Sequence, residues 1–240
     1  MTTVRPALDA AVRQTIAART EALFRSSGAF RDGHFQLKSG RHGDAYVEKF
    51  QVLQDPAATS ELCGYFAAHG RGRDGETLVD LVAGPTTGGV ILAFETARHL
   101  GVRGIFAEEL RADDGTMRRE FRRGFRIEPG ERILLVDDIL TTGGSLLAML
   151  PAVEAMGGEI VECIVLVDRS GGRATLTSPL TGRVYPLRSL WQVDLPTYEP
   201  GPATCPRCAD GMPLHAPGST GTGGGLAGTG PRTAADTAAG

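Results

Sequence analysis

The amino-acid sequence predicts an α/β fold in which a parallel sheet is flanked by helices. Strand-like and helix-like patterns alternate through the middle of the 240-residue chain, as in repeated βα units. The strand-like segments are nearly continuous apolar runs, which is expected of strands covered on both faces. Glycine follows the helix-like segments and is the residue that most often ends a helix.

The N-terminal part, about residues 1–55, predicts an appendage to this core. Between residues 8 and 27 the apolar side chains recur at helical spacing, and Gly28 follows as a stop. The segment 34–53 carries aromatic and β-branched residues on either side of turn signals, so it predicts two short strands joined by a loop.

The core is expected over residues 56–200. Because open parallel sheets bind ligands at the carboxyl ends of their strands, the residues that follow the strands are the first candidates for a site. The predicted strands are 78–83, 102–107, 133–137 and 160–167, and the predicted helices are about 89–100 and 145–156.

Two further segments lack a regular period. Residues 110–132 carry charges of both signs and predict a long loop or irregular ribbon, a kind of segment that is often a functional lid. Residues 201–240 predict a C-terminal extension rich in proline and glycine. From about residue 217 the extension has almost nothing to bury, so we expect disorder there.

Composition excludes several classes of function. The chain is 41% hydrophobic and 22% charged, and its formal net charge of −3 gives no basic field that would attract nucleic acid. No apolar run reaches the ~18 residues of a membrane span, and the N-terminus lacks the apolar region of a signal peptide. Four scattered cysteines are too few for a disulfide framework. We therefore expect a cytoplasmic protein with no membrane or nucleic-acid partner.

The segment 133–150, ILLVDDILTTGGSLLAML, carries the strongest signal. An apolar strand leads into two carboxylates, a turn of threonines and glycines, and a helix. Glycines let the backbone approach an anion, and the hydroxyls and free N–H groups at the helix start donate hydrogen bonds to it. Asp137 and Asp138 can accept hydrogen bonds from a vicinal diol. The pattern predicts a site for a phosphorylated ribose, and the alternative is a solvated carboxylate pair before an ordinary capped helix.

This segment resembles the signature with which type I phosphoribosyltransferases bind phosphoribosyl pyrophosphate (PRPP). A Walker-type loop would need G-x-x-x-x-G-K-[ST], and a dinucleotide site would need G-x-G-x-x-G between a strand and a helix, so a kinase or dehydrogenase is disfavoured. The resemblance implies a type I phosphoribosyltransferase-like fold, an acidic pair that holds the ribose hydroxyls, and a turn that holds the 5′-phosphate. The implied PRPP-binding residues are Asp137, Asp138, Ile139, Leu140, Thr141, Thr142, Gly143, Gly144 and Ser145.

A second strand runs into a glycine-rich turn at VAGPTTGGVILA, residues 82–93. Alone, such a turn is more often a plain connection between strand and helix. In the resembled family the corresponding turn binds pyrophosphate through backbone amides. The residues implied are Gly84, Pro85, Thr86, Thr87, Gly88 and Gly89.

Other features resemble the orotate phosphoribosyltransferases within that family. Residues 35–40, FQLKSG, resemble the family's N-terminal hood, which implies that Lys38 lies near PRPP or the base. Arg169 follows Asp168 where the family has an orotate-binding arginine, and Thr141 is implied in the same site. An arginine can bind the anionic base through two parallel hydrogen bonds. The alternatives are a solvated surface lysine and an ion pair between Arg169 and Asp168.

The chain departs from the family pattern at two places. The pyrophosphate turn has Thr87 and Gly88 where the family commonly has a lysine. The segment that corresponds to the mobile loop has no lysine or histidine. We therefore expect the loop's catalytic charge to come from arginines, although a charged face of a ribbon is an equal alternative for each: Arg118, Arg119, Arg122 and Arg123.

The resemblance implies an enzyme of pyrimidine biosynthesis that transfers the 5-phosphoribosyl group from PRPP to orotate, giving orotidine 5′-monophosphate and pyrophosphate. It also implies Mg²⁺ carried by PRPP, with no firm protein ligand, and a homodimer in which the loop reaches the neighbouring site. Two alternatives remain open, namely transfer to another base and a PRPP-sensing regulator without turnover.

Cys205-x-x-Cys208 could be half of a zinc site. Tetrahedral zinc needs two more ligands, and His215 is the only candidate nearby in the sequence. We therefore interpret the pair as part of a turn in the C-terminal loop.

Overall fold

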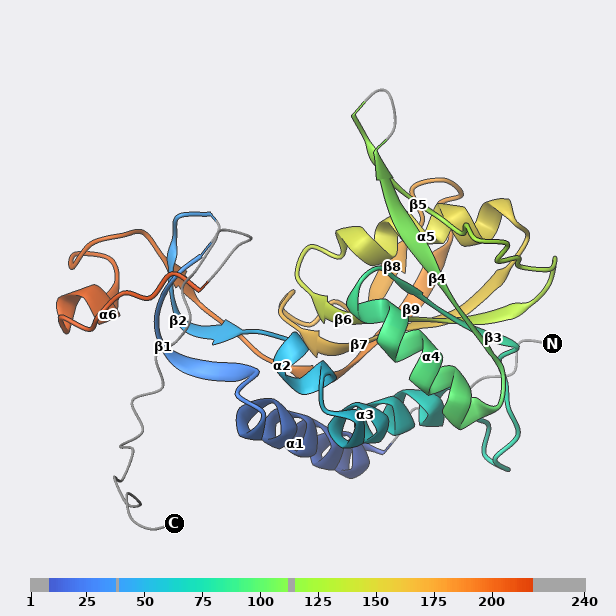
Figure 1. Cartoon of the computed structure of the whole chain (residues 1–240), viewed down its shortest axis with the longest axis horizontal. Helices are drawn as coiled ribbons and strands as arrows, with labels where there is room; N and C mark the ends of the chain where they lie inside the picture. The colour runs from blue at the N-terminus through green and yellow to red at the C-terminus, as the bar shows by residue number, and fades with distance from the viewer. Residues whose placement is uncertain (1–8, 38, 112–114, 218–240) are drawn as a thin grey trace, which may run out of the picture.

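The computed structural model describes residues 9–37, 39–111 and 115–217. Within these ranges the chain forms an α/β core and a smaller hood, which lie side by side in Figure 1. The disorder expected from about residue 217 falls almost entirely outside the described residues, and so does Lys38.

The core sheet has seven strands in the order β5-β4-β3-β6-β7-β9-β8. The strands from β4 to β9 pair in parallel, and an antiparallel strand closes each edge. The predicted parallel sheet is therefore confirmed, although the sequence patterns predicted neither β9 nor the short edge strands. The bounds are β3 Leu81–Pro85, β4 Arg103–Arg111, β5 Met117–Glu120, β6 Arg132–Leu140, β7 Glu159–Asp168, β8 Thr175–Thr177 and β9 Val184–Gln192.

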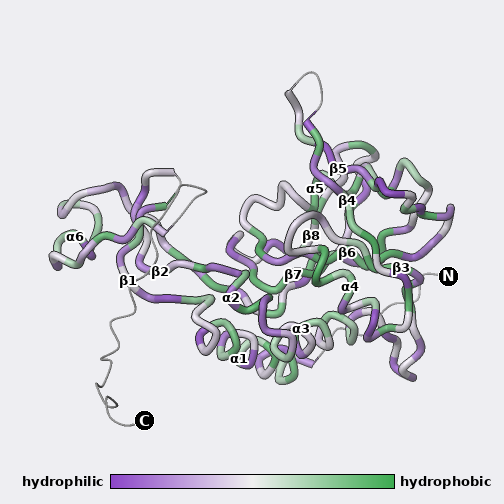
Figure 2. Tube along the Cα trace, in the orientation of Figure 1, coloured by the Kyte–Doolittle hydropathy of each residue, from purple (hydrophilic) through white to green (hydrophobic). Residues whose placement is uncertain are grey.

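Alternate residues of β6 face opposite sides of the sheet, as the two-residue period of a strand requires. Ile133 and Leu135 pack in the same cluster as helix α5 (Gly144–Ala155), whereas Leu134 and Val136 pack in the cluster on the other face. That face is covered by α1 (Ala10–Ser26), α3 (Pro56–His69) and α4 (Gly88–Leu100), with the short α2 (Phe50–Leu53) beside them. Figure 2 shows hydrophobic residues along the central strands between these layers. Burial on both faces explains the continuous apolar runs.

Helix α3 was not predicted, yet it begins with a strong local signal. The carboxylate of Asp55 accepts hydrogen bonds from the backbone N–H groups of Ala57 and Ala58 at 2.9 and 3.2 Å, and Pro56 occupies the first turn. The helices α1, α4 and α5 were predicted to within about two residues of their bounds. No helix in the described part of the chain is both long and apolar enough to cross a membrane.

The polar segment 110–132 begins as a β ribbon. Strand β4 continues to Arg111 and pairs with β5, so that Glu109 lies opposite Arg119. In Figure 1 the ribbon projects beyond the rest of the core. The prediction of an irregular ribbon is confirmed, and its tip, residues 112–114, lies outside the described residues.

The hood is a three-stranded antiparallel sheet in the order β1-β2-β10. Strands β1 (Phe30–Gln36) and β2 (His42–Val47) form the predicted pair, and β10 (Thr197–Tyr198) joins them from beyond the core. The chain then forms the short helix α6 (Pro206–Ala209) and returns along β1. There His215 exchanges backbone hydrogen bonds of 2.8 Å with His34 and Gln36. The described part of the C-terminal extension is therefore integrated into the hood.

Candidate active site

Two turns meet at the carboxyl ends of β3 and β6. The first turn, residues 84–88, leads into α4 and contains a cis peptide between Thr86 and Thr87. The second turn, residues 141–144, leads into α5, where Gly143 has a φ of 84°, a left-handed conformation that favours glycine. Both helices therefore begin at the same edge of the sheet, with their free N–H groups at the two turns.

The first turn touches the end of β6, which leads into the second turn, at Gly88 and Asp138. A Cβ atom added to Gly88 would lie 2.0 Å from Oδ2 of Asp138. Inside the first turn, a Cβ atom on Gly84 would lie 2.4 Å from the carbonyl oxygen of Gly89. Only glycine fits at Gly84, because the clash there is with backbone, and a side chain at Gly88 would displace the carboxylate of Asp138. The two motifs, predicted separately from the sequence, therefore form one site.

The carboxylates of Asp137 and Asp138 are buried, with 7% and 5% of their residue surface exposed. Oδ1 of Asp137 accepts a hydrogen bond of 2.8 Å from the N–H of Asp138, and Oδ1 of Asp138 accepts one of 2.7 Å from Ile139. Burial, together with the negative charge of Asp138, raises the pKa of Asp137 well above its usual range. The pair would be stabilised by hydroxyl donors or by added positive charge.

Lys49 contributes one positive charge to this pair, since its Nζ lies 2.8 Å from Oδ2 of Asp138. It lies at the junction of the hood and the core, just before α2. Sequence reasoning missed Lys49 because its partner is far away along the chain. A compositional signal could have found it: Lys38 and Lys49 are the only lysines in a chain that otherwise uses arginine.

Arg119 is the loop arginine that contacts the first turn. Its Nη1 donates to Oγ1 and to the carbonyl oxygen of Thr86 at 2.9 and 3.2 Å. Its Nη2 lies 2.9 Å from Oε2 of Glu109, and only 8% of the residue is exposed. The ribbon therefore delivers one buried guanidinium to the first turn.

The other loop arginines are arranged differently. Arg123 forms an ion pair with Glu108, and Arg118 and Arg122 are exposed. In this arrangement they resemble the charged face of a ribbon, which was the alternative interpretation for each arginine.

Arg169 lies beside the second turn, and its backbone N–H donates a hydrogen bond of 2.8 Å to the carbonyl oxygen of Leu140. Its Nε is buried and has no hydrogen-bond partner among the described residues, and burial lowers the pKa of its guanidinium. No ion pair with Asp168 is found among the described residues, and Oδ1 of Asp168 accepts a hydrogen bond of 2.7 Å from the backbone N–H of Ser170. An unpaired buried donor of this kind is costly unless an anion binds to it.

Arg173 was not predicted as a site residue. Its Nη1 donates to the carbonyl oxygen of Thr142 at 2.8 Å and lies beside Gly143. Arg173, like Arg169, follows the end of β7. This position after a strand was the sequence signal that could have identified it as a site residue.

The structure brings most of the predicted PRPP-binding residues together. Ile139 and Leu140 belong to β6, which runs further than predicted, and Lys38 lies outside the described residues. The residues on or beside the two turns are Gly84, Pro85, Thr86, Thr87, Gly88, Asp137, Asp138, Thr141, Thr142, Gly143, Gly144 and Ser145.

Comparisons with known proteins place the chain among phosphoribosyltransferases. Residues 60–179 match the family described as the phosphoribosyl transferase domain. The orotate phosphoribosyltransferase of Pelotomaculum thermopropionicum is 42% identical over 198 residues, which cover 82% of this chain and 95% of the relative. That of Chlorobaculum parvum is 40% identical over 202 residues, covering 84% of this chain and 95% of the relative.

Solved structures show the same fold. The orotate phosphoribosyltransferase of Aeropyrum pernix superposes with a TM-score of 0.57 at 26% identity, covering 72% of this chain and 92% of that one. The adenine phosphoribosyltransferase of Leishmania tarentolae gives a TM-score of 0.52 at 20% identity, covering 72% and 87%, and is similar in fold alone.

Proposed function

The chain belongs to the orotate phosphoribosyltransferase family, and from that premise we propose that it transfers the 5-phosphoribosyl group of PRPP to orotate, in pyrimidine biosynthesis. The observation that carries the proposal is the contact of Gly88, in the first turn, with Asp138, at the end of the strand that leads into the second turn. PRPP has a pyrophosphate and a 5′-phosphate at opposite ends of one ribose. Two anion-binding turns on either side of a buried carboxylate pair match that arrangement.

The second turn fits the 5′-phosphate. Helix α5 begins at Gly144, so free N–H groups and the positive end of the helix dipole lie where the phosphate would bind. Thr141, Thr142 and Ser145 add hydroxyl donors. Asp137 and Asp138 would accept further hydrogen bonds, from the ribose hydroxyls, beside those that they accept from Lys49 and the backbone.

The first turn fits the pyrophosphate. Its glycines expose backbone N–H groups at the start of α4, and Arg119 lies against Thr86. When PRPP binds, the guanidinium of Arg119 can exchange its contact with Glu109 for a phosphate oxygen. It would then neutralise charge on the leaving group, as the family's lysine does.

The reaction is a displacement at C1 of the ribose. A ring nitrogen of orotate forms the new bond to C1 as the bond to pyrophosphate breaks, and the bonding electrons leave with the pyrophosphate. Positive charge develops on the ribose ring during this step. The chain's contribution is to hold the two reactants in line and to stabilise the departing charge, and no side chain has to act as a covalent nucleophile.

We propose Mg²⁺ as the cofactor, carried into the site by PRPP. The donor set fits, because Mg²⁺ prefers oxygen ligands and keeps several waters, and two buried carboxylates lie side by side here. Asp137 and Asp138 would hold the ion's hydrated shell together with the ribose hydroxyls. When bound, the ion neutralises pyrophosphate oxygens.

Arg169 is proposed to bind orotate. Its buried Nε can donate to the carboxylate or a ring oxygen of the base, which would remove the cost of an unpaired donor. Thr141 is proposed in the same site because it begins the second turn. Lys38 is proposed near PRPP or the base on the family resemblance alone.

The test is the loss of orotate's ultraviolet absorbance when the purified chain is mixed with PRPP, Mg²⁺ and orotate. We expect a loss that requires PRPP and is accompanied by one pyrophosphate released for each orotate consumed. Parallel reactions with uracil, adenine and hypoxanthine should be at least about 100-fold slower, because these bases lack the anionic group. Turnover of one of these bases in place of orotate, or PRPP binding without turnover of any base, would contradict the assignment.

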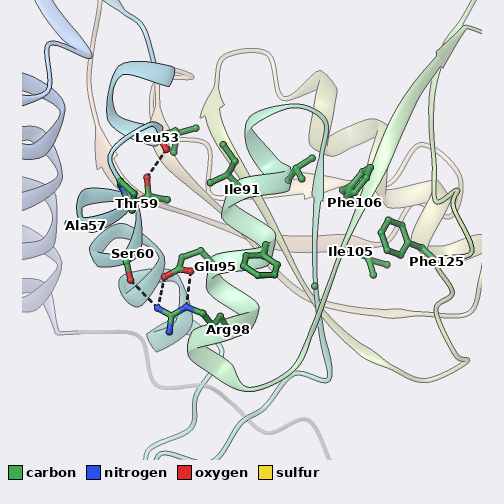
Figure 3. Close-up of a pocket in the computed structure, with 14 residues that line it drawn as sticks. Leu53, Ala57, Thr59, Ser60, Ile91, Glu95, Arg98, Ile105, Phe106 and Phe125 are labelled. Atoms are coloured by element: carbon green, nitrogen blue, oxygen red, sulfur yellow. Dashed lines mark hydrogen bonds and ion pairs between the residues drawn. The ribbon is translucent and has the colours of Figure 1, made fainter.

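We also propose that the protein acts as a homodimer in the cytoplasm, where its four free cysteines suit a reducing compartment. The dimer proposal rests on the family resemblance and on an apolar groove between α3 and α4, beside β4. Figure 3 shows Ile91, Phe106 and Phe125 at this groove, with the ion pair of Arg98 and Glu95 at its edge. A second copy of the chain would cover these side chains.

Replacing Phe94, which lines this groove and is 67% exposed, by glutamate is expected to give a monomer, because a buried unpaired charge would oppose association. Sedimentation equilibrium of the wild type and of F94E measures this directly. Leu180→Glu is the matched control, since Leu180 is 60% exposed and lies outside the groove. A dimer of unchanged stability in F94E would contradict this interface.

A further inference from the structure

Four metal-binding side chains converge inside the hood, away from the two turns. His34 lies on β1, His42 begins β2, and Cys205 and Cys208 lie at α6. Their ligand atoms all lie within 4.8 Å of one another. His34, His42 and Cys205 are 2%, 5% and 1% exposed. Cys205 and Cys208 are both free thiols.

Three nitrogen–sulfur distances in this cluster are close to the edges of a metal tetrahedron. Zinc bonds of ~2.0–2.1 Å to nitrogen and ~2.3 Å to sulfur place a nitrogen and a sulfur ligand about 3.5 Å apart at the tetrahedral angle. Nε2 of His34 lies 3.5 and 3.6 Å from the sulfur atoms of Cys205 and Cys208, and Nδ1 of His42 lies 3.3 Å from that of Cys208. The two ring nitrogens are 2.9 Å apart, so a central ion would need them to separate by a few tenths of an ångström.

Hydrogen bonds alone do not satisfy this cluster. Nδ1 of His34 lies 2.8 Å from the carbonyl oxygen of Met212, and only a ring N–H can make that bond. Nε2 of the neutral ring therefore has one lone pair and can accept one hydrogen bond. Three groups face it, namely His42 and the thiols of Cys205 and Cys208, so it cannot accept from all of them. A backbone carbonyl that fixes the second nitrogen of a histidine is the arrangement found around metal ligands.

We propose that His34, His42, Cys205 and Cys208 bind one Zn²⁺ ion in a closed structural site. Two nitrogens and two sulfurs select zinc over Mg²⁺ or Ca²⁺, which prefer oxygen. Four protein ligands leave no open position for a substrate, so the ion's role is to hold structure. The sequence interpretation of the cysteine pair as a plain turn missed this site because the histidines belong to the other end of the chain, and His215 is not a member.

The zinc ion would join the first hairpin of the hood to the C-terminal segment. The described hood has only three short strands, and few of its apolar residues are buried; they include Phe30, Phe35 and Ala45. A sheet of this size gains little from its own core, so a metal can supply much of its stability. The ligands His34 and His42 also bracket the connection in which Lys38 lies along the sequence.

The first experiment measures zinc in the purified full-length chain by inductively coupled plasma mass spectrometry. We expect about one zinc per chain in the wild type and in Cys63→Ala, a control that removes a buried thiol outside the cluster. We expect a loss of at least about tenfold in Cys205→Ala and in His42→Ala. A wild-type chain without stoichiometric zinc after reconstitution with ZnCl₂, or a disulfide between Cys205 and Cys208, would overturn the proposal.

A rescue variant separates ligand loss from misfolding. His42 presents Nδ1, the ring nitrogen nearer the backbone, so its reach is close to that of a cysteine sulfur. His42→Cys is therefore expected to regain about one zinc per chain as a Cys₃His site. Cobalt reconstitution of the wild type should give thiolate-to-cobalt charge-transfer bands and the intense visible bands of a tetrahedral site. Retention of metal by His42→Ala would contradict the ligand set.

Discussion

Replacing Asp137 and Asp138 together by asparagine is expected to lower the rate of orotate consumption by about three orders of magnitude. Each carboxylate is proposed to accept a hydrogen bond from a ribose hydroxyl, and hydrogen bonds to charged groups contribute ~1.5–3 kcal/mol each. The asparagines keep the shape of the site, and their side-chain oxygens can still accept hydrogen bonds from the backbone N–H groups of residues 138 and 139. The initial rate at saturating orotate and PRPP measures the effect. A loss of less than about tenfold would remove this pair from the mechanism.

In the absence of ligands, replacing Asp137 by asparagine is expected to stabilise the folded protein. Burial and the charge of Asp138 raise the pKa of Asp137, so the folded state holds a proton that the unfolded state releases above its ordinary pKa of about 4. Stability therefore falls as the pH rises from that value through the raised pKa. At pH 8, Asp137→Asn removes this cost, and we expect its Tm to exceed that of the wild type by roughly 2–4 °C for each kcal/mol gained.

Asp80 provides a matched control, because its pKa is shifted in the opposite direction from that of Asp137. Its carboxylate accepts hydrogen bonds from the side chain of Arg132 at 2.6 and 2.9 Å, and this guanidinium lowers the pKa of Asp80. Asp80→Asn is therefore expected to leave activity unchanged and to lower the Tm at pH 8 by no more than about 4 °C, since a partly exposed pair contributes at most ~1 kcal/mol. A Tm decrease in Asp137→Asn at pH 8 would show that the buried charge is already balanced in the empty site.

Replacing Arg169 by alanine is expected to raise the KM for orotate by about 30-fold to 5,000-fold. Removing one partner of a buried charge pair costs ~2–5 kcal/mol, and the orotate anion would be left without its donor. The KM for PRPP should stay within about threefold of the wild-type value, because the two turns are unchanged. Steady-state kinetics with each substrate varied in turn separate these effects.

Two further variants test how Arg169 acts. Arg169→Lys keeps the charge but loses the planar pair of donors, so it should recover only part of the affinity for orotate. Arg183→Ala removes an exposed arginine that lies over the ring of Tyr185 and should change neither KM. Equal increases in the KM values for orotate and PRPP in Arg169→Ala would show that Arg169 maintains the conformation of the second turn and does not bind the base.

The parts of the site that were predictable from the sequence are local in the chain. The strand, turn and helix of residues 133–150 follow one another directly, so their chemistry can be inferred from spacing alone. The same holds for the pyrophosphate turn at residues 84–88. A site at the carboxyl ends of the strands followed from the rule for open parallel sheets, whereas the contact between Gly88 and Asp138 is seen only in the structure.

The parts that were missed depend on contacts between distant segments. Lys49 reaches Asp138 only because the hood leads into the core at that point. His34 and Cys205 are 171 positions apart, and no periodicity connects them. The four arginines of the ribbon could not be distinguished by sequence, because the alternation that buries Arg119 and exposes Arg118 depends on the pairing of β5 with β4.

The return of the C-terminal segment to β1 also sets the order in which the molecule can assemble during synthesis. The hairpin of β1 and β2 leaves the ribosome early, but its backbone partner His215 is made more than 160 residues after β2 ends. At ~5–20 residues per second, that interval is about 10–30 s. The α/β core can form within this time, while the hairpin still lacks β10 and the C-terminal strand-like segment. The hood is therefore the last unit to close, and a nascent chain stalled before residue 197 would carry a nearly complete core and an open sheet edge.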